Sequence, residues 1–239
     1  MKRALVTGGS GEIGAAICRR LAADGCRVIV HSNRQRQKAD ALVASIVAQG
    51  GSAETAMFDV TDRAGCAASL QALLEPGAIQ ILVNNAGIHA DAVFPGMSGE
   101  QWDSVIDVSL NGFYNVTQPL LMPMIRSRWG RIITVSSIAG LIGNRGQVNY
   151  SAAKGALHAA SKALALEVAS RGITVNAVAP GIIATAMSES AFNAEAIKAL
   201  VPMKRAGRPE EVADLVTFLA SEQAAYISGQ IISINGAMI

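Results

Sequence analysis

Residues 4–14 read ALVTGGSGEIG, an apolar strand-like run that leads directly into a glycine-rich turn. A helix-period stretch follows near 13–24. In such a strand, turn and helix, backbone N–H groups approach a pyrophosphate, and the helix N-terminus favours its negative charge. This stretch therefore predicts an α/β fold that binds a nucleotide pyrophosphate at its first turn.

The rest of the chain repeats this alternation. The strand-like runs are ALVT (4–7), RVIVH (27–31), AETAMF (53–58), QILVN (80–84), RIITVS (131–136), ITVNAV (173–178) and QIISI (230–234). Between them lie helix-period stretches near 13–24, 35–49, 63–75, 100–127, 150–170 and 209–221. The alternation predicts one domain over residues 1–239, a doubly wound seven-stranded parallel sheet with helices on both faces. Residues 185–208 fit the pattern poorly, and we expect them to form a lid over the substrate.

Composition agrees with that fold and limits the function. The chain is 51% apolar and 16% charged, which suits a parallel sheet buried on both faces. A net charge of +2 gives no broad basic field for nucleic acid, and the longest uncharged stretch, 172–188, is interrupted by Pro180 and is no membrane span. Cys18, Cys26 and Cys66 form an odd, unpatterned set. With no signal peptide before the first strand, we expect reduced thiols, a cytoplasmic location and no metal site.

A second stretch, SIAGLIGNRGQVNYSAAK at 137–154, carries the candidate chemistry. Tyr150 and Lys154 are four residues apart and lie on one face of a helix. A phenol has a reference pKa of ~10, and we expect a lysine ammonium one turn away to lower it. Ser137 follows a strand-like run, so it lies at a strand's carboxyl end, where open α/β sheets bind ligands. The three residues predict carbonyl reduction, in which Ser137 hydrogen-bonds the oxygen and Tyr150 protonates it while a hydride attacks the carbon.

Together these stretches resemble the short-chain dehydrogenase/reductase family over nearly the whole chain. The resemblance depends on a serine thirteen residues before Tyr-x-x-x-Lys and on a turn close to the family pattern T-G-x-x-x-G-x-G. It implies a Rossmann-like fold, catalysis by Ser137, Tyr150 and Lys154, and contact of Lys154 with a nicotinamide ribose. At the place of Ser109 many members have an asparagine. The resemblance implies a catalytic role there too, in which the backbone of Ser109 holds a water that links to the lysine.

The first turn departs from the family pattern at Glu12. Thr7, Gly8 and Gly14 match the pattern, but the middle glycine is replaced by a carboxylate that adds bulk and negative charge beside phosphates. Glu12 either faces solvent in the first turn of a helix, which the helix dipole favours, or weakens cofactor binding. We favour weakened but surviving binding, and a cofactor-poor, non-catalytic scaffold remains a minor alternative.

The end of the second strand predicts which cofactor is bound. Here the chain has Ser32, Asn33 and Arg34 where an acidic residue would favour an unphosphorylated ribose. Arginine binds phosphate bidentately, so we expect NADP(H) rather than NAD(H). The alternative is a solvated basic start of a helix.

The resemblance implies further cofactor contacts after the third, fourth and sixth strands, beside the adenine, the ribose and the nicotinamide. The complete expected set is Thr7, Gly8, Gly9, Ser10, Gly11, Ile13, Asn33, Arg34, Asp59, Val60, Asn85, Ala86, Gly87, Tyr150, Lys154, Pro180, Gly181, Ile183 and Thr185.

Within the family, the spacing is most similar to the reductases of 3-oxoacyl-[acyl-carrier-protein]. Those enzymes hold arginines at the positions of Arg128 and Arg171, where they contact the acidic carrier protein. The resemblance implies NADPH-dependent reduction of a 3-oxoacyl thioester in fatty-acid or related polyketide-like synthesis, by a homotetramer. Reduction of acetoacetyl-CoA, or oxidoreduction of another alcohol or ketone, are the alternatives. We expect no nucleic-acid or membrane partner.

Overall fold

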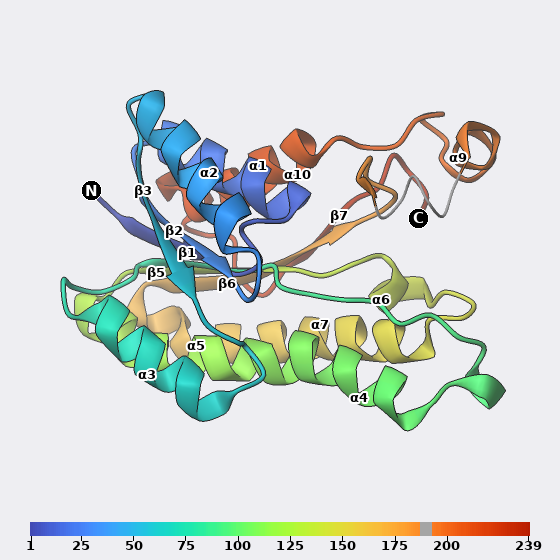
Figure 1. Cartoon of the computed structure of the whole chain (residues 1–239), viewed down its shortest axis with the longest axis horizontal. Helices are drawn as coiled ribbons and strands as arrows, with labels where there is room; N and C mark the ends of the chain where they lie inside the picture. The colour runs from blue at the N-terminus through green and yellow to red at the C-terminus, as the bar shows by residue number, and fades with distance from the viewer. Residues whose placement is uncertain (187–192) are drawn as a thin grey trace.

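The computed structural model describes residues 1–186 and 193–239, and within them all seven predicted strands form one parallel sheet (Figure 1). The strands are β1 (Arg3–Val6), β2 (Arg27–Ser32), β3 (Ser52–Met57), β4 (Ile81–Asn84), β5 (Gly130–Val135), β6 (Ile173–Pro180) and β7 (Ile231–Ile234). Their order is β3-β2-β1-β4-β5-β6-β7. The predicted fold class is confirmed.

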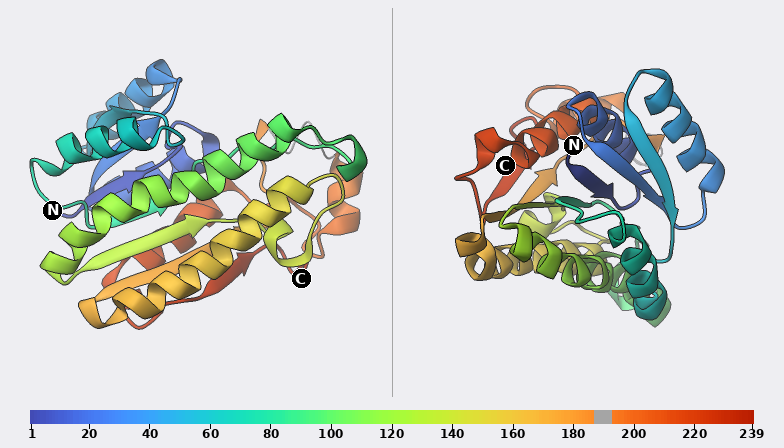
Figure 2. Two further views of the ribbon diagram at one scale, coloured as in Figure 1. Left: turned by 90° about the horizontal axis from the view of Figure 1, so that it is seen from below. Right: turned by 90° about the vertical axis from the view of Figure 1, so that its left-hand side faces the viewer.

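Helices cover both faces of the sheet (Figure 2). One face packs against α1 (Glu12–Ala23), α2 (Arg36–Ala48) and α10 (Pro209–Ala220), and the other against α3 (Arg63–Leu74), α5 (Gly112–Ser127) and α7 (Val148–Val168). Successive strand residues point to opposite faces, so Ala4 and Val6 join the first apolar core while Leu5 joins the second. Burial on both faces explains why β1 reads as a continuous apolar run.

The helix predicted near 100–127 is interrupted in the structure. It consists of α4 (Gly99–Ile106), a π-helical turn (Asp107–Asn111) and α5. The start of α4 is fixed by a capping box, in which Ser98 and Gln101 exchange side-chain and backbone hydrogen bonds. A π-helical turn inside a helix often lies at a functional site, and Ser109 lies in this one.

Shorter elements lie near the carboxyl ends of the strands. There α6 (Ala139–Ile142) follows β5, and α9 (Ala194–Leu200) forms part of the predicted lid (Figure 1). Residues 187–192 of that lid lie outside the described residues, so the lid stays a prediction.

Two findings bear on the composition. All three cysteines are free and buried. In residues 1–186 and 193–239, no helix combines the length and the apolar character that a membrane crossing requires.

Candidate active site

The glycine-rich turn is locked to the chain segment that follows β4. The hydroxyl of Thr7 accepts hydrogen bonds from the backbone N–H groups of Asn85, at 2.9 Å, and Ala86, at 3.0 Å. The side-chain amide of Asn85 donates in turn to the carbonyls of Thr7 and Gly8. A Cβ on Gly14 would overlap the Gly8 carbonyl oxygen and lie 2.8 Å from the Asn85 amide nitrogen. Gly14 is therefore required for the close approach of turn and helix.

The start of α1 is open to an anion. Its N-cap is Gly11, which has no side chain to cap the first amides of the helix. These N–H groups and the helix dipole favour a negatively charged ligand at this end. With Gly14 making room for the turn, these residues fit the pyrophosphate of a dinucleotide.

Glu12 lies at this same helix start and is not simply solvated. Its side chain is exposed, but its Oε2 accepts a hydrogen bond of 2.9 Å from the backbone N–H of Ala186. The carboxylate thus connects the first turn with the segment after β6. Glu12 is thus exposed in the first turn of α1, as one interpretation expected, and also binds Ala186, while its effect on cofactor affinity stays a prediction.

Polar groups after β2 and β3 form the predicted adenosine end. The Asp59 carboxylate accepts hydrogen bonds from the backbone and side chain of Thr61, and the Asn33 side chain lies near it. These donors, led by the Thr61 N–H, lower the pKa of Asp59, and the charge of Arg34 adds to the effect. Asn33 and Arg34 are exposed, and Val60 is buried. Ser10 in the first turn donates to Ser32 at 2.9 Å. The structure therefore brings together the residues that are predicted to bind the adenosine end of the cofactor.

Ser137, Tyr150 and Lys154 meet where β5 ends and α7 begins. The Ser137 side chain lies beside the Tyr150 phenol and favours its ionised form. The Lys154 ammonium lies 5.5 Å from the centroid of the Tyr150 ring and donates to the carbonyl of Val135 at 3.0 Å. A Cβ on Gly87 would lie 3.3 Å from Nζ, so this glycine makes room for the lysine. The predicted catalytic group is assembled by β5 and one face of α7.

The electrostatics of this group differ from the sequence-based expectation. Burial raises the pKa of Tyr150, an effect that the neighbouring Ser137 opposes and the charge of Asp91 reinforces. Burial also lowers the pKa of Lys154 to about 8. The expected lowering of the tyrosine pKa is therefore wrong for this structure, because removal from water is the largest effect on it.

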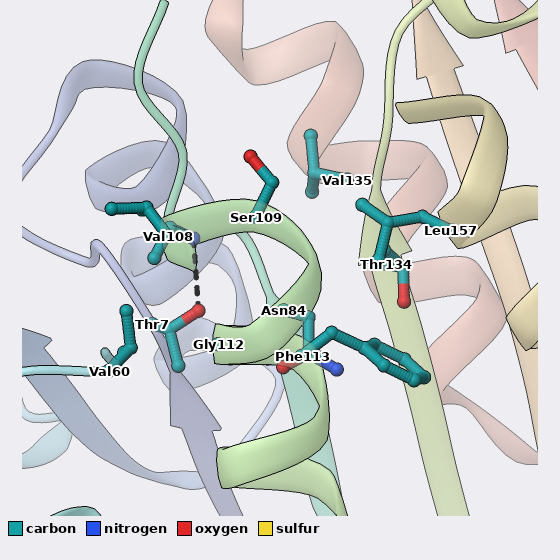
Figure 3. Close-up of a pocket in the computed structure, with 11 residues that line it drawn as sticks. Thr7, Val60, Asn84, Val108, Ser109, Gly112, Phe113, Thr134, Val135 and Leu157 are labelled. Carbon is teal, nitrogen blue, oxygen red and sulfur yellow. Dashed lines mark hydrogen bonds between the residues drawn. The ribbon is translucent and has the colours of Figure 1, made fainter. Parts of the chain in front are cut away.

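Ser109 lines a small cavity beside that group (Figure 3). The cavity measures about 10 Å³, room for roughly one water molecule. Ser109 is buried in the π-helical turn, and Thr134 is buried in β5; neither hydroxyl has a hydrogen-bond partner among the described residues. Val135, whose carbonyl binds Lys154, also lines the cavity. Ser109 thus lies near the catalytic group, although no hydrogen bond joins the described Ser109 and Lys154.

The chain after β6 completes the carboxyl edge of the sheet. The carbonyl of Pro180 accepts from the N–H of Ile138, which directly follows Ser137, at 3.0 Å. Gly181 packs where a Cβ would lie 2.8 Å from the Cβ of Asn235. Ile183 is buried and Thr185 is partly buried. Pro180 therefore lies beside the residue that follows the serine, while the nicotinamide contact of Ile183 and the phosphate contact of Thr185 stay predictions.

The two candidate carrier-protein arginines lie at the other edge of the sheet. Arg128 and Arg171 are exposed and precede the amino ends of β5 and β6, and Arg128 donates to the carbonyl of Ser170 at 3.3 Å. The structure brings these two arginines together, but not to the Tyr150 of the same chain.

Two residues that support the site, His31 and Asn149, were not predicted from the sequence. His31 in β2 binds the first turn, and Asn149 at the start of α7 donates to the carbonyls of Ala90 and Gln101 at 2.9 and 2.8 Å. Asn149 thereby holds the segments after β4 against the catalytic helix. The signal for His31 was a polar side chain inside the otherwise apolar run VIVH. For Asn149 the only signal in the sequence was its position next to Tyr150.

Comparison with known proteins gives matches along the whole chain. A family profile described as short chain dehydrogenase matches residues 2–196. The chain is 46% identical over 236 residues to 3-oxoacyl-[acyl-carrier-protein] reductase FabG of Aggregatibacter actinomycetemcomitans, with 98% of each chain covered. It is 44% identical over 240 residues to nodulation protein G of Azospirillum brasilense, covering 99% of this chain and 98% of that one. It is 40% identical over 250 residues to acetoacetyl-CoA reductase of an Acinetobacter species, covering 99% and 97%.

Proposed function

The chain belongs to the short-chain dehydrogenase family and is thus an oxidoreductase, and on that premise we propose that it reduces a 3-oxoacyl thioester on acyl carrier protein to the 3-hydroxyacyl thioester. The observation that carries this proposal is that Tyr150 lies beside both Ser137 and Lys154, at the edge of the sheet where the glycine-rich turn also lies. The name of the relative from Aggregatibacter actinomycetemcomitans, at 46% identity, supports the 3-oxoacyl substrate.

Family membership implies a nicotinamide cofactor, and NADPH is the form we propose. The start of α1, where no side chain caps the first amides, and the glycine-rich turn that packs against Gly14 would hold its pyrophosphate. Exposed Arg34 after β2 supports a 2′-phosphate. When bound, the nicotinamide supplies the hydride that adds to the 3-oxo carbon.

The chain's own side chains orient the ketone and supply the proton. Ser137 donates a hydrogen bond to the 3-oxo oxygen and polarises the carbonyl. Tyr150, whose raised pKa keeps it protonated at neutral pH, gives its proton to the oxygen as negative charge develops there. Lys154 stabilises the resulting phenolate and contacts the ribose, and water held beside Ser109 replenishes the proton. A tyrosine that stays protonated in the resting enzyme suits the role of a general acid.

Two exposed arginines bear on which carrier holds the acyl group. Arg128 and Arg171 supply positive charge that suits an acidic carrier protein. Because they lie at the amino edge of the sheet, we propose that they serve the site of a neighbouring protomer in a homotetramer. Apolar Met122 and Leu166, exposed on α5 and α7, support such assembly. Cytoplasmic location is part of the same proposal.

Acetoacetyl-CoA reduction is the second candidate, because one relative at 40% identity carries that name. Rates with acetoacetyl thioesters of carrier protein and of coenzyme A, each with NADPH and with NADH, separate the two. Faster turnover of the carrier-protein thioester supports the first proposal, and faster turnover of the CoA thioester supports the second.

Tyr150→Phe tests the chemistry common to both. The variant keeps the ring but removes the proton donor, so turnover should fall by at least about a hundredfold while NADPH binding changes little. Tyr226→Phe is the matched control, because that ring is fully exposed. If Tyr150→Phe reduced substrate at near the parent rate, the proton-donor role would be wrong.

A further inference from the structure

His31 makes two hydrogen bonds from the buried end of β2. Its Nδ1 accepts from the backbone N–H of Gly8 at 3.1 Å, and its Nε2 lies 2.9 Å from the carbonyl oxygen of Phe58. Since an amide N–H only donates and a carbonyl only accepts, the ring proton resides on Nε2. The side chain is 2% exposed, and burial lowers its pKa to about 4, so the ring is neutral at pH 7.

This one ring joins three strand ends that border the predicted dinucleotide site. Gly8 opens the phosphate turn after β1, and Phe58 directly precedes the predicted adenine contacts after β3. The backbone carbonyl of His31 also accepts from the N–H of Gly9 at 2.8 Å. Residue 31 therefore satisfies two successive amides of the turn and fixes how that turn leaves the sheet.

Gly8 needs such a partner because its conformation is permissive. Its φ is +62°, a region that glycine enters about as readily as its mirror image. Without an acceptor, the partly buried Gly8 N–H would lose its partner, and the peptide before Gly8 would be free to reorient. The amides that follow in the turn would then lose their alignment toward a phosphate.

We propose that His31 is a positioning residue for the cofactor, which acts through the Nδ1–Gly8 hydrogen bond to hold the phosphate-binding turn in its binding-competent form. The proposal rests on the proposed function, since that function requires a dinucleotide at this turn. His31 does not itself contact the cofactor.

A pair of substitutions separates the two hydrogen bonds of the ring. In His31→Asn, the Oδ1 atom takes the place of Nδ1 and retains the acceptor for Gly8. In His31→Gln, the side-chain amide reaches toward Phe58 and retains that donor but leaves Gly8 without an acceptor. Both variants lose the ring that packs on Phe58 at 4.0 Å between centroids, so packing loss is shared by the pair.

Binding of NADPH, measured by fluorescence titration, is the first readout. Loss of the partner of the Gly8 N–H predicts affinity at least about tenfold weaker in His31→Gln, while His31→Asn stays within about threefold of the parent. Equal affinity in the two variants would overturn the proposal, because a structural role of the ring alone treats them alike. Thermal unfolding identifies any variant that does not fold.

Hydrogen exchange of the Gly8 amide in the cofactor-free protein, followed by NMR, is the second readout. We expect protection in the parent and in His31→Asn and its loss in His31→Gln, and equal protection in both variants would overturn the role of Nδ1. If the parent bound neither NADPH nor NADH, the proposed function would fail while this exchange experiment still decided whether His31 holds the turn.

Discussion

Replacing Lys154 by methionine should make the cofactor-free protein more stable while removing its activity. Lys154 is 4% exposed, and burial lowers its pKa from 10.5 to about 8. Each pKa unit corresponds to about 1.4 kcal/mol, so keeping this ammonium charged in the fold costs about 3 kcal/mol at pH 7. Methionine is similar in length, flexible and uncharged, and avoids that cost. It also leaves the carbonyl of Val135 without its donor, a loss of about 1 kcal/mol. The expected net gain at pH 7 is therefore about 2 kcal/mol.

The gain should depend on pH in one direction. Between pH 8 and 10.5 the unfolded Lys154 binds more protons than the folded one, so the stability of the parent rises with pH in this range. The advantage of Lys154→Met should accordingly shrink by roughly 2 kcal/mol from pH 7 to pH 9.5.

Urea unfolding of the cofactor-free proteins at the two pH values measures this difference in free energy. Lys162→Met, which replaces an exposed lysine of α7, serves as the control and should show neither the gain nor its pH dependence. A Lys154→Met protein that is no more stable than the parent at pH 7, or a gain that stays constant with pH, would refute the reasoning.

Three further substitutions test the nucleotide end. Gly14→Ala places a Cβ against the Gly8 carbonyl and should destabilise the protein by about 2 kcal/mol in urea unfolding. In the control Gly11→Ala, the atom nearest to the new Cβ lies at 3.4 Å, so no such loss is expected. Equal losses of stability in the two variants would contradict this packing effect. Arg34→Ala should raise the KM for NADPH severalfold more than that for NADH in steady-state kinetics, and a parallel rise in both would exclude a contact with the 2′-phosphate. Glu12→Gly removes a negative charge beside the phosphates and should tighten NADPH binding severalfold in a fluorescence titration; unchanged affinity would show that the carboxylate has no cost.

The strand and helix pattern was readable from local sequence because each element carries its own periodicity. Ala4, Leu5 and Val6 of β1 are all buried, which gives the continuous apolar run expected in a sheet covered on both faces. The long helix between 100 and 127 was predicted without its π-helical turn, because an inserted residue of this kind leaves the apolar spacing on both sides nearly intact.

The catalytic residues could be predicted from the sequence for a different reason. Tyr150 and Lys154 share one helix face by spacing alone, and Ser137 comes two residues after the end of β5. The positions of all three therefore follow from short-range geometry. The direction in which the pKa of Tyr150 shifts could not be predicted from the sequence, because it depends on how far the folded chain removes water from the hydroxyl.

The sequence by itself determined the order of strands and helices, the turn that Gly14 closes, and the spacing of the serine, tyrosine and lysine, since periodicity and residue spacing act within a few turns of chain. Only the tertiary structure decided that His31 holds Gly8 and Phe58, that Glu12 reaches the backbone of Ala186, and that burial raises the pKa of Tyr150. Those contacts join segments far apart in the chain, and burial is a property of the whole fold, so no local pattern encodes them.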